Sequence, residues 1–300
     1  MSTKKYIILL TAHLLIGMVY GCVEETEVEL WGECYNIEQT TILNLFDSEL
    51  SGEIPEDIGQ LVNLISLILP FNQLTGEIPQ GIGNLEVLEI LDLRSNQLTG
   101  DIPDFIGEMI TLRHIFLQNN FLEAIPDNIG NLVNLLELDL HSNSLAGSIP
   151  TGIESLTGLS YLYLNNNSLA GEIPDNIGNL LDMEILSLFN NELSGQIPPS
   201  ICNIQDYQYI ILDNNQFCPP YPECLDENEI GPQDTSECMY IDGCDLNSDG
   251  EITILDIVIV LSCILDDNEC DYLCMDYNSD SNIDIFDILL MINIITNNLR

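Results

Sequence analysis

Basic side chains are almost absent from this sequence. Its 300 residues include 5 Lys and Arg against 49 Asp and Glu, which gives a formal net charge of -44. This excludes a nucleic-acid partner, because proteins bind phosphate backbones through basic side chains. No Lys or Arg lies between Arg113 and Arg300, so the acidic half of the chain would repel itself unless cations neutralise it. We therefore expect bound divalent cations, with calcium as the first candidate.

Catalytic motifs are missing as well. The sequence has no HExxH pattern, no nucleophile elbow and no phosphate-binding loop. A catalytic or metal site is conceivable on adjacent strands, formed by His114, Glu137, Asp139 and His141. Asp92 with Asp139 could also offer the two carboxylates of a glycosidase. Acidic residues are so abundant here that such a pair carries little information. We predict a non-enzymatic protein with no catalytic residue.

The chain begins like an exported protein. Lys4 and Lys5 precede an apolar run over residues 6–20, and the small residue Gly21 follows, which is typical of a secretory signal peptide over residues 1–21. The run is short for a membrane span, so we expect no transmembrane segment in the mature chain. The expected location is extracellular or at the cell surface.

Cys22 has two interpretations. Cys34 follows twelve residues later and the total of 10 cysteines is even, which indicates a disulfide. Residues 19–22 also resemble a bacterial lipobox, in which Cys22 would carry a lipid anchor and the protein would be a bacterial lipoprotein. We favour the disulfide, because lipidation would leave an odd thiol.

The other eight cysteines fall into two groups, and we expect them to form disulfides in an oxidising compartment. Zinc is the rival explanation, but His114 and His141 are the only His residues after the signal and lie far from both groups in the sequence. Within the second group we pair Cys263 with Cys270 or Cys274. The groups are Cys202, Cys218, Cys224 and Cys238, followed by Cys244, Cys263, Cys270 and Cys274.

A repeat of 24 residues occupies the middle of the chain, with the pattern LxLxxNxLxGxIPxxIGxLxxLxx. The fourth unit has 23 residues, because FLEAIP replaces the LxGxIP form. Seven full units and a partial one result. They begin at Leu43, Leu67, Leu91, Ile115, Leu138, Leu162, Leu186 and Ile210.

Leu at the first and third positions of each unit predicts a short strand with one buried face. A single unit cannot bury its leucines alone, so we expect stacked units that form a solenoid with a parallel strand ladder, at about 4.8 Å per repeat. In every unit after the first, an Asn follows the strand, where its amide would satisfy backbone groups of the turn. These residues predict an asparagine ladder: Asn72, Asn96, Asn120, Asn143, Asn167, Asn191 and Asn215.

This pattern resembles the leucine-rich repeat family, specifically the LxGxIPxxIG subtype of plant receptor ectodomains. The resemblance covers residues 43–216 and implies an α/β solenoid, a right-handed superhelix with a parallel β ladder. Trp31, Gly32 and Cys34 resemble the N-terminal cap of such proteins, here residues 22–42. Residues 217–238, with FCPPYPEC, resemble a C-terminal cap. No kinase motif follows the repeats, so the resemblance implies no kinase activity.

In this family the variable strand positions form a concave ligand-binding face. Here they hold an aromatic band and a polar group, which suit a protein, a peptide or a glycan. The alternative is that the aromatic side chains only fill gaps between neighbouring strands. We favour an interaction site, because an exposed row of this size usually marks one. The predicted binding residues are Asp92, Arg94, Phe116, Glu137, Asp139, His141, Tyr161, Tyr163, Phe189 and Tyr209.

Two twelve-residue segments after Cys238, DLNSDGEITILD and DYNSDSNIDIFD, have the spacing of calcium loops. Oxygen ligands at positions 1, 3, 5, 7, 9 and 12 suit this hard cation. Gly250 supplies the tight turn of the first loop, whereas Ser281 takes that place in the second, so we expect the second site to be weaker. The predicted ligands are Asp245, Asn247, Asp249, Glu251, Thr253 and Asp256, then Asp276, Asn278, Asp280, Asn282, Asp284 and Asp287.

An apolar stretch follows each loop, and residues 255–265 and 285–295 are predicted helices. Two loops with one helix each resemble a type I dockerin over residues 244–297, within a predicted domain of residues 239–300. The resemblance implies a small α-helical, EF-hand-like calcium-binding domain that binds a cohesin-type partner. One departure leaves the partner open, because apolar residues replace the polar ones that commonly contact cohesin in cellulosomal dockerins. They are Ile254, Leu255, Ile285 and Phe286.

These patterns together predict an exported, non-catalytic recognition protein. Its repeats would present a ligand surface, and its calcium-dependent module would attach it to a cohesin-like or other surface protein. The alternative is a non-catalytic, glycan-targeting subunit of a polysaccharide-degrading complex.

Overall fold

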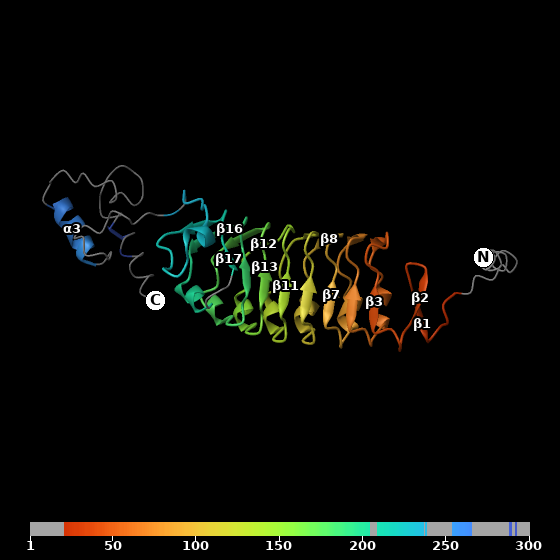
Figure 1. Cartoon of the computed structure of the whole chain (residues 1–300). Coiled ribbons are helices and arrows are strands. Elements are labelled where there is room, and N and C mark those ends of the chain that lie inside the picture. The colour runs from red at the N-terminus through yellow and green to blue at the C-terminus, as the bar shows by residue number, and fades with distance from the viewer. Residues whose placement is uncertain are drawn as a thin grey trace, which may run out of the picture. The chain divides into compact units, whose positions relative to one another are not determined.

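The structure is a computed structural model that describes residues 21–204, 209–236, 238, 254–265, 288, 289 and 292. The chain divides into two compact units, Met1–Ser236 and Glu237–Arg300, and each is described by itself. Within the first unit, Figure 1 shows a row of stacked coils. The predicted signal peptide lies outside the described residues, except for Gly21.

One parallel sheet of eight strands runs through all the coils of the first unit. Each strand pairs with the equivalent strand of the next repeat in the same register, so that Leu91 lies opposite both Leu67 and Ile115. The predicted solenoid with a parallel ladder is therefore confirmed. The strands are β3 (Ile42–Asn44), β5 (Ser66–Ile68), β7 (Ile90–Asp92), β9 (His114–Phe116), β11 (Glu137–Asp139), β13 (Tyr161–Tyr163), β15 (Ile185–Ser187) and β17 (Tyr209–Ile211).

The two leucine positions of each strand form the core. Leu91, Leu93, Leu138 and Leu140 are fully buried, because alternate side chains of a strand point to opposite faces of the sheet. The apolar residues of the IP, IG and second Leu positions join them in one continuous cluster that extends along the coils. Burial of this apolar surface is the main contribution that holds the coils together.

A second short strand and a 3-10 helix complete each coil. The second strands form two sheets of four, β4 (Ser51–Glu53), β6 (Gln73–Gly76), β8 (Gln97–Gly100) and β10 (Phe121–Leu122), then β12 (Ala146–Gly147), β14 (Ser168–Gly171), β16 (Glu192–Gln196) and β18 (Gln216–Cys218). The helices are η1 (Glu56–Gln60), η2 (Gln80–Asn84), η3 (Asp104–Glu108), η4 (Asp127–Asn131), η5 (Thr151–Ser155), η6 (Ile177–Asn179) and η7 (Pro199–Asn203).

The two flanking sheets separate at the shortened fourth repeat. Its FLEAIP segment lacks the glycine of the LxGxIP form, and β10 does not pair with β12. Two backbone hydrogen bonds still cross this point, from Ser144 N to Leu122 O at 2.9 Å and from Ala146 N to Glu123 O at 2.8 Å. The missing residue is absorbed on this side of the coil, while the eight-stranded sheet continues without a break.

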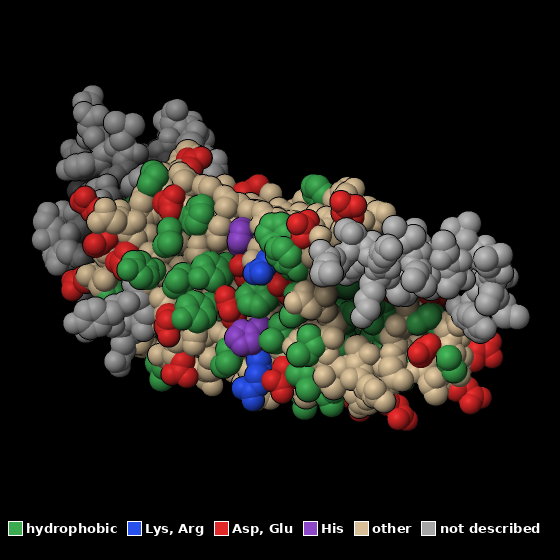
Figure 2. Space-filling model, turned by 45° about the vertical axis from the view of Figure 1, so that its right-hand side comes forward, with side chains coloured by type: hydrophobic (Ala, Val, Ile, Leu, Met, Phe, Trp, Pro, Cys, Tyr) green, Lys and Arg blue, Asp and Glu red, His purple; other side chains and the backbone are tan. Residues whose placement is uncertain are grey.

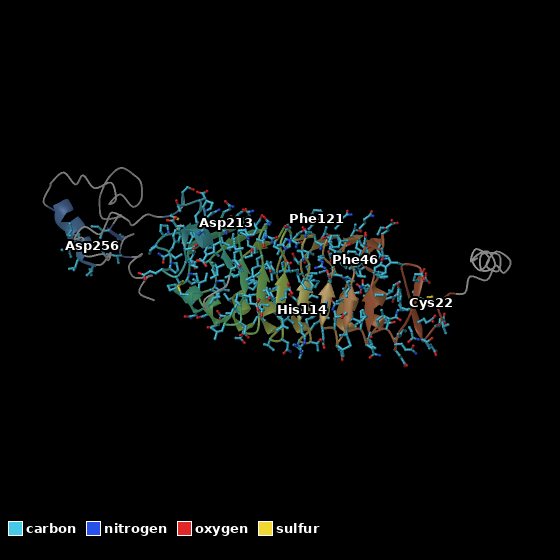
Figure 3. All side chains as sticks on the ribbon, in the orientation of Figure 1. Cys22, Phe46, His114, Phe121, Asp213 and Asp256 are labelled. Carbon is cyan, nitrogen blue, oxygen red and sulfur yellow. A yellow bond between two sulfur atoms is a disulfide. The ribbon has the colours of Figure 1, made fainter. Side chains whose placement is uncertain are left out.

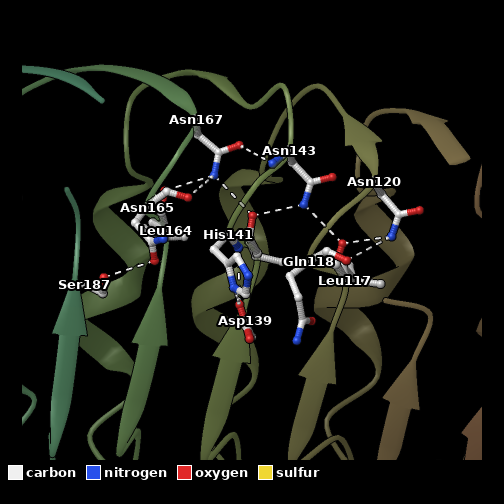
Figure 4. Close-up of polar contacts among 11 residues, drawn as sticks. Leu117, Gln118, Asn120, Asp139, His141, Asn143, Leu164, Asn165, Asn167 and Ser187 are labelled. Atoms are coloured by element: carbon white, nitrogen blue, oxygen red, sulfur yellow. Dashed lines mark hydrogen bonds and ion pairs between the residues drawn. The ribbon is translucent and has the colours of Figure 1, made fainter. Parts of the chain in front are cut away.

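The predicted asparagine ladder is present. Asn120 donates from Nδ2 to the carbonyl of Leu117 in its own coil at 3.0 Å and to that of Leu93 in the preceding coil at 3.1 Å. Its Oδ1 accepts from the backbone N–H of Leu98 at 3.0 Å. Asn143 and Asn167 repeat this pattern (Figure 4). Each side chain thus satisfies backbone groups of two coils at once.

The N-terminal end of the solenoid is covered by an antiparallel hairpin of β1 (Glu27–Leu30) and β2 (Glu33–Asn36). Its Val28 and Leu30 are buried against the core. Cys22 and Cys34 form a disulfide, so the disulfide interpretation of Cys22 holds. Because a sulfur atom in a disulfide cannot also carry a lipid, the lipobox interpretation of Cys22 is wrong for this structure.

At the C-terminal end, Gln233 takes over the role of the ladder asparagines. It donates to the carbonyls of Leu212 and Ile230 at 2.9 and 2.6 Å and accepts from Phe217 N at 3.2 Å. The short helix α2 (Glu227–Ile230) precedes it. Cys202 and Cys224 form a disulfide. Cys218 takes part in a disulfide, as does Cys238, and none of the described cysteines is free.

In the second unit, α3 (Ile254–Leu265) agrees with the predicted first helix. Residues 288, 289 and 292 are helical and fall within the predicted second one. Asp256 and Ile257 are buried, whereas Ile254 and Leu255 are exposed. Among the described residues, no helix is both long and apolar enough to cross a membrane. The dockerin fold and the Cys263 pairing stay predictions, because most of their residues lie outside the described ones.

Candidate functional site

The solvent-facing side of the eight-stranded sheet is called the strand face below. It carries the side chains that flank the buried leucines, such as Glu137 and Asp139 on either side of Leu138. All ten predicted binding residues lie in these strands or directly after them, so the structure brings them to one face. Figure 2 shows histidine and basic side chains near the middle of this face, with hydrophobic and acidic ones around them.

The middle of the strand face holds an Asp–Arg–Phe group. Asp92 is 5% exposed and pairs with Arg94 at 3.3 Å, and the Arg94 guanidinium lies 5.4 Å from the centre of the Phe116 ring. Burial raises the pKa of the Asp92 carboxyl above its ordinary value, although Arg94 and a backbone hydrogen bond act to lower it. The cation is thus held by a carboxylate and an aromatic ring from neighbouring coils.

The two histidines bind carboxylates beside this group. His141 Nδ1 lies 2.6 Å from Asp139 Oδ1, and His114 Nδ1 lies 3.4 Å from Glu137 Oε2. The rings of His114 and Phe116 are stacked, with centres 6.0 Å apart. His114 (labelled in Figure 3) is absent from the predicted binding residues, although its position before Ile115 matches that of Tyr161 before Leu162.

Tyrosines dominate the strand face after β11. Tyr161 donates a short hydrogen bond from its hydroxyl to the carboxylate of Glu184. This bond raises the pKa of Tyr161, with burial and nearby carboxylates adding to the effect. Burial raises the pKa of Tyr163, and Glu137, Asp139 and Glu184 raise it further. Tyr209 is 69% exposed at the end of the row.

An apolar patch at the N-terminal end of this region is missing from the predicted residues. Phe46 and Phe71 are half exposed, and their ring centres lie 5.3 Å apart. Ile42 and Ile65 are exposed nearby in the same coils. Ile42 and Phe46 occupy the repeat positions of Tyr161 and Asn165, so the repeat alignment could have identified these two residues.

Several buried polar side chains lie beside the turns that follow the strands. Ser187 donates to Asn165 Oδ1 at 3.0 Å, as Figure 4 shows. Gln118 is 6% exposed, and its Oε1 has no hydrogen-bond partner. The Nε of Arg94 is likewise buried without a partner. These two atoms leave hydrogen-bonding capacity unused on the strand face.

Of the twelve predicted calcium ligands, only Asp256 lies among the described residues. It is fully buried near the start of α3. Within the part of the chain that the structure describes, no group of three or more His, Cys, Asp or Glu side chains could hold a metal ion. A surface pocket at the C-terminal cap, lined by Asn191, Asn214 and Gln233 among others, contains none of the predicted binding residues.

Comparison with known families agrees with this geometry. The family described as leucine-rich repeat region matches residues 87–206, and the family described as leucine rich repeat matches residues 63–85. The chain therefore contains leucine-rich repeats, as the sequence pattern predicted. Among curated proteins, no relative matches this chain.

Several similar solved structures are plant receptor ectodomains. The ectodomain of the receptor kinase GASSHO1/SCHENGEN3 from Arabidopsis thaliana, in complex with CASPARIAN STRIP INTEGRITY FACTOR 2, is 38% identical with a TM-score of 0.55, covering 59% of this chain and 21% of that one. Arabidopsis HAESA, in complex with the peptide hormone IDA and the co-receptor SERK1, is 32% identical with a TM-score of 0.54, covering 61% and 31%. The plant peptide hormone receptor RGFR1 with RGF2 is 30% identical with a TM-score of 0.51, covering 59% and 32%.

The chain thus spans about a fifth to a third of the length of these receptors. The shared region is the repeat solenoid. No dockerin-type protein is among the similar structures described above, so the dockerin resemblance stays with the sequence.

Proposed function

We propose that this protein is an exported recognition protein that binds an extended polypeptide across its strand face. The observation that carries the proposal is the continuous row of aromatic, acidic and imidazole side chains on the face of an unbroken eight-stranded sheet. Aromatic rings provide large contact areas at a low entropic cost, and they dominate the energetics of protein interfaces. The similar receptor ectodomains described above were solved with peptide or protein ligands, which supports the same use of the fold.

A capture experiment tests this function. Immobilised full-length protein and a Tyr161→Ser/Tyr209→Ser variant are exposed to extracellular and envelope proteins of the source organism. We expect a polypeptide that the wild-type protein retains and the variant loses, because both rings leave the strand face. Phe121→Ser is the matched control, since Phe121 is an exposed aromatic residue on the flanking strand β10. Equal retention by all three proteins would contradict the proposal.

The alternative, a glycan-targeting subunit of a polysaccharide-degrading complex, is decided by the same variants. Aromatic rings also stack on sugars, so the tyrosine pair serves both hypotheses. Retention of the wild-type protein on insoluble polysaccharides, lost in Tyr161→Ser/Tyr209→Ser and kept in Phe121→Ser, would favour the glycan role over the polypeptide role.

We further propose that residues 239–300 form a calcium-dependent, dockerin-like module that attaches the protein to a cohesin-type or other surface partner. The predicted ligands are all oxygen donors, which fits Ca²⁺, and the start of α3 at Ile254 fits the end of the first loop. Bound calcium would supply folding free energy to this small unit and would neutralise part of its negative charge. The second loop, with Ser281 at the turn, would hold its ion more weakly.

Calcium titration of the full chain tests this module. We expect two binding events, of which Asp245→Ala removes the tighter one and Asp276→Ala the weaker one. A chelator should abolish capture of a surface partner without affecting ligands of the strand face. The absence of calcium binding at millimolar concentration would contradict the proposal.

A further inference from the structure

The C-terminal part of the strand face carries several carboxylates and no Lys or Arg. Arg94 follows β7 and Arg113 directly precedes β9. No Lys or Arg occurs in the sequence between Arg113 and Arg300. From β11 onward the sheet and its edges carry Glu137, Asp139 and Glu184. The upward pKa shift of Tyr163, to which all three carboxylates contribute, is consistent with a negative field there.

Two of these carboxylates lie on either side of an aromatic ring on successive coils. This arrangement of Glu137, Tyr161 and Glu184 is called the Tyr161 clamp below. Glu137 of β11 lies opposite Tyr161 of β13 in the ladder. Glu184, which directly precedes β15, accepts the hydrogen bond of the Tyr161 hydroxyl. Neighbouring strands are about 4.8 Å apart, so the ring has a carboxylate from the coil on each side. Among the described residues, no Lys or Arg forms an ion pair with either glutamate, and the ion pair of Glu137 is with His114.

The same face already shows how such an arrangement holds a cation. The guanidinium of Arg94 lies over Phe116 and against the Asp92 carboxylate. The order of carboxylate and ring on adjacent strands is the one found for Glu137 and Tyr161 in the clamp, where no Lys or Arg of the described residues takes the place of Arg94. A cation placed there would gain both ion pairing and the attraction of the aromatic face.

We propose that the Tyr161 clamp binds an Arg or Lys side chain of an extended, basic polypeptide segment. The inference rests on the proposed function of the strand face and adds the charge of its ligand. Charge complementarity carries it, because the face from β11 to β17 offers carboxylates and aromatic rings and contains no Lys or Arg. Tyr163 and the exposed Tyr209 extend the aromatic surface beyond the clamp, which a single small cation would not use. On the coil next to that of Glu137, the Oε1 of the buried Gln118 has no hydrogen-bond partner and could accept from a donor of the ligand.

The test measures binding of a fluorescent peptide of alternating Arg and Ser to the full-length protein. The comparison peptide has citrulline in place of Arg, which keeps the shape and removes the charge. We expect the citrulline peptide to bind about tenfold more weakly, and Glu137→Gln/Glu184→Gln to weaken the Arg peptide by about the same factor. Tyr161→Leu should weaken it too, whereas Tyr161→Phe, which keeps the ring, should retain most of the affinity.

A matched control separates the clamp from the overall charge of -44. Glu53→Gln/Glu172→Gln removes the same two charges from exposed positions outside the strand face, and it should change the affinity by less than twofold. Equal weakening by both double variants would show attraction to the general field and would overturn the proposal, as would equal binding of the citrulline peptide. Free arginine that competes as well as the peptide would overturn the choice of a polypeptide.

The outcomes also distinguish this inference from the proposed function. If Tyr161→Ser/Tyr209→Ser loses a captured polypeptide while the two glutamates make no difference to it or to the Arg peptide, the strand face is a binding surface and the clamp proposal is wrong. If neither tyrosine nor glutamate variants affect any ligand, both proposals fail. The thermal unfolding midpoint of each variant is measured as well, and a midpoint equal to that of wild type verifies that the fold is retained.

Discussion

At the scale of single residues, the ladder asparagines show how a polar side chain becomes part of the core. Asn120 is 4% exposed, and its amide is hydrogen-bonded to three backbone groups. The two carbonyls are each shared with a neighbouring asparagine of the ladder, Asn96 or Asn143. Unpaired polar groups in such a place are costly, because they lose water without gaining a partner.

Asn120→Ala is therefore expected to destabilise the repeat unit by about 1–3 kcal/mol, because the buried N–H of Leu98 loses its partner and two carbonyls each lose one of their two side-chain donors. Urea unfolding followed by circular dichroism measures this loss as a lower midpoint. Asn131→Ala is the control, because Asn131 is exposed in η4, and it should stay within about 0.5 kcal/mol of wild type. Equal stability of the two variants would contradict the structural role of the ladder.

The Tyr161–Glu184 hydrogen bond predicts a pH effect. The carboxylate stabilises the protonated phenol and raises the pKa of Tyr161, so this bond contributes to stability below the ordinary phenol pKa of about 10 and is lost as the pH rises through the raised value. Alkaline titration of tyrosine absorbance should show one phenol that ionises earlier in Glu184→Gln than in wild type. An unchanged titration curve would show that the bond is absent in solution.

Single residues also show where sequence reasoning succeeds and where it stops. The asparagine column was predictable because seven equivalents stand at the same repeat position. Gln233 was not, because its repeat has degenerated and only the hydrogen bonds reveal that it continues the ladder. Glu184 was missed because it precedes its strand, and its contact with Tyr161 depends on side-chain conformation. The ring contact between Phe46 and Phe71 was missed because the two residues stand at different repeat positions.

At the scale of secondary-structure elements, several of the 3-10 helices pack so closely that a glycine in them has no room for a side chain. A Cβ on Gly130 of η4 would lie 2.1 Å from the carbonyl oxygen of Gly152 in η5. The atoms that this Cβ would meet belong to the backbone of Gly152, which cannot move aside as a flexible side chain would. The IG glycine of the repeat thus allows close approach of adjacent coils, and the repeat pattern alone does not disclose this reason.

Gly130→Ala should destabilise the repeat unit by about 1–3 kcal/mol through this overlap. Gly158→Ala is the matched control, because nothing lies within 4 Å of the Cβ that it would add, and it should be neutral or slightly stabilising. Differential scanning calorimetry of both variants measures the difference. A Gly130→Ala protein as stable as wild type would mean that η4 and η5 are far enough apart to hold a Cβ at this position.

At the scale of the whole molecule, the charge distribution opposes the compact state. The described residues contain four ion pairs, two of which involve His, against a formal charge of -44. Most carboxylates therefore repel one another without a fixed counter-charge. Sequence composition predicted this property fully, since it depends on residue counts and hardly on the fold.

Added salt should therefore stabilise the protein. Between about 0.1 and 1 M NaCl the screening length falls from about 10 to about 3 Å, and we expect a gain of about 1 kcal/mol, which corresponds to about 2–4 °C in the unfolding midpoint. The variant Glu53→Gln/Glu77→Gln/Glu172→Gln should begin at a higher midpoint and gain less from salt. A midpoint independent of ionic strength, measured with a chelator present, would contradict this account.

The shortened fourth repeat has a consequence for how such a protein can change over generations. One residue is missing from that unit, yet the eight inner strands continue in register from β3 to β17. Deletions on the flanking side are thus tolerated, while duplication of one coding unit would lengthen the strand face by one strand spacing, about 4.8 Å. A lineage carrying this fold can fit its recognition surface to longer or shorter partners by copying or losing whole units of its gene.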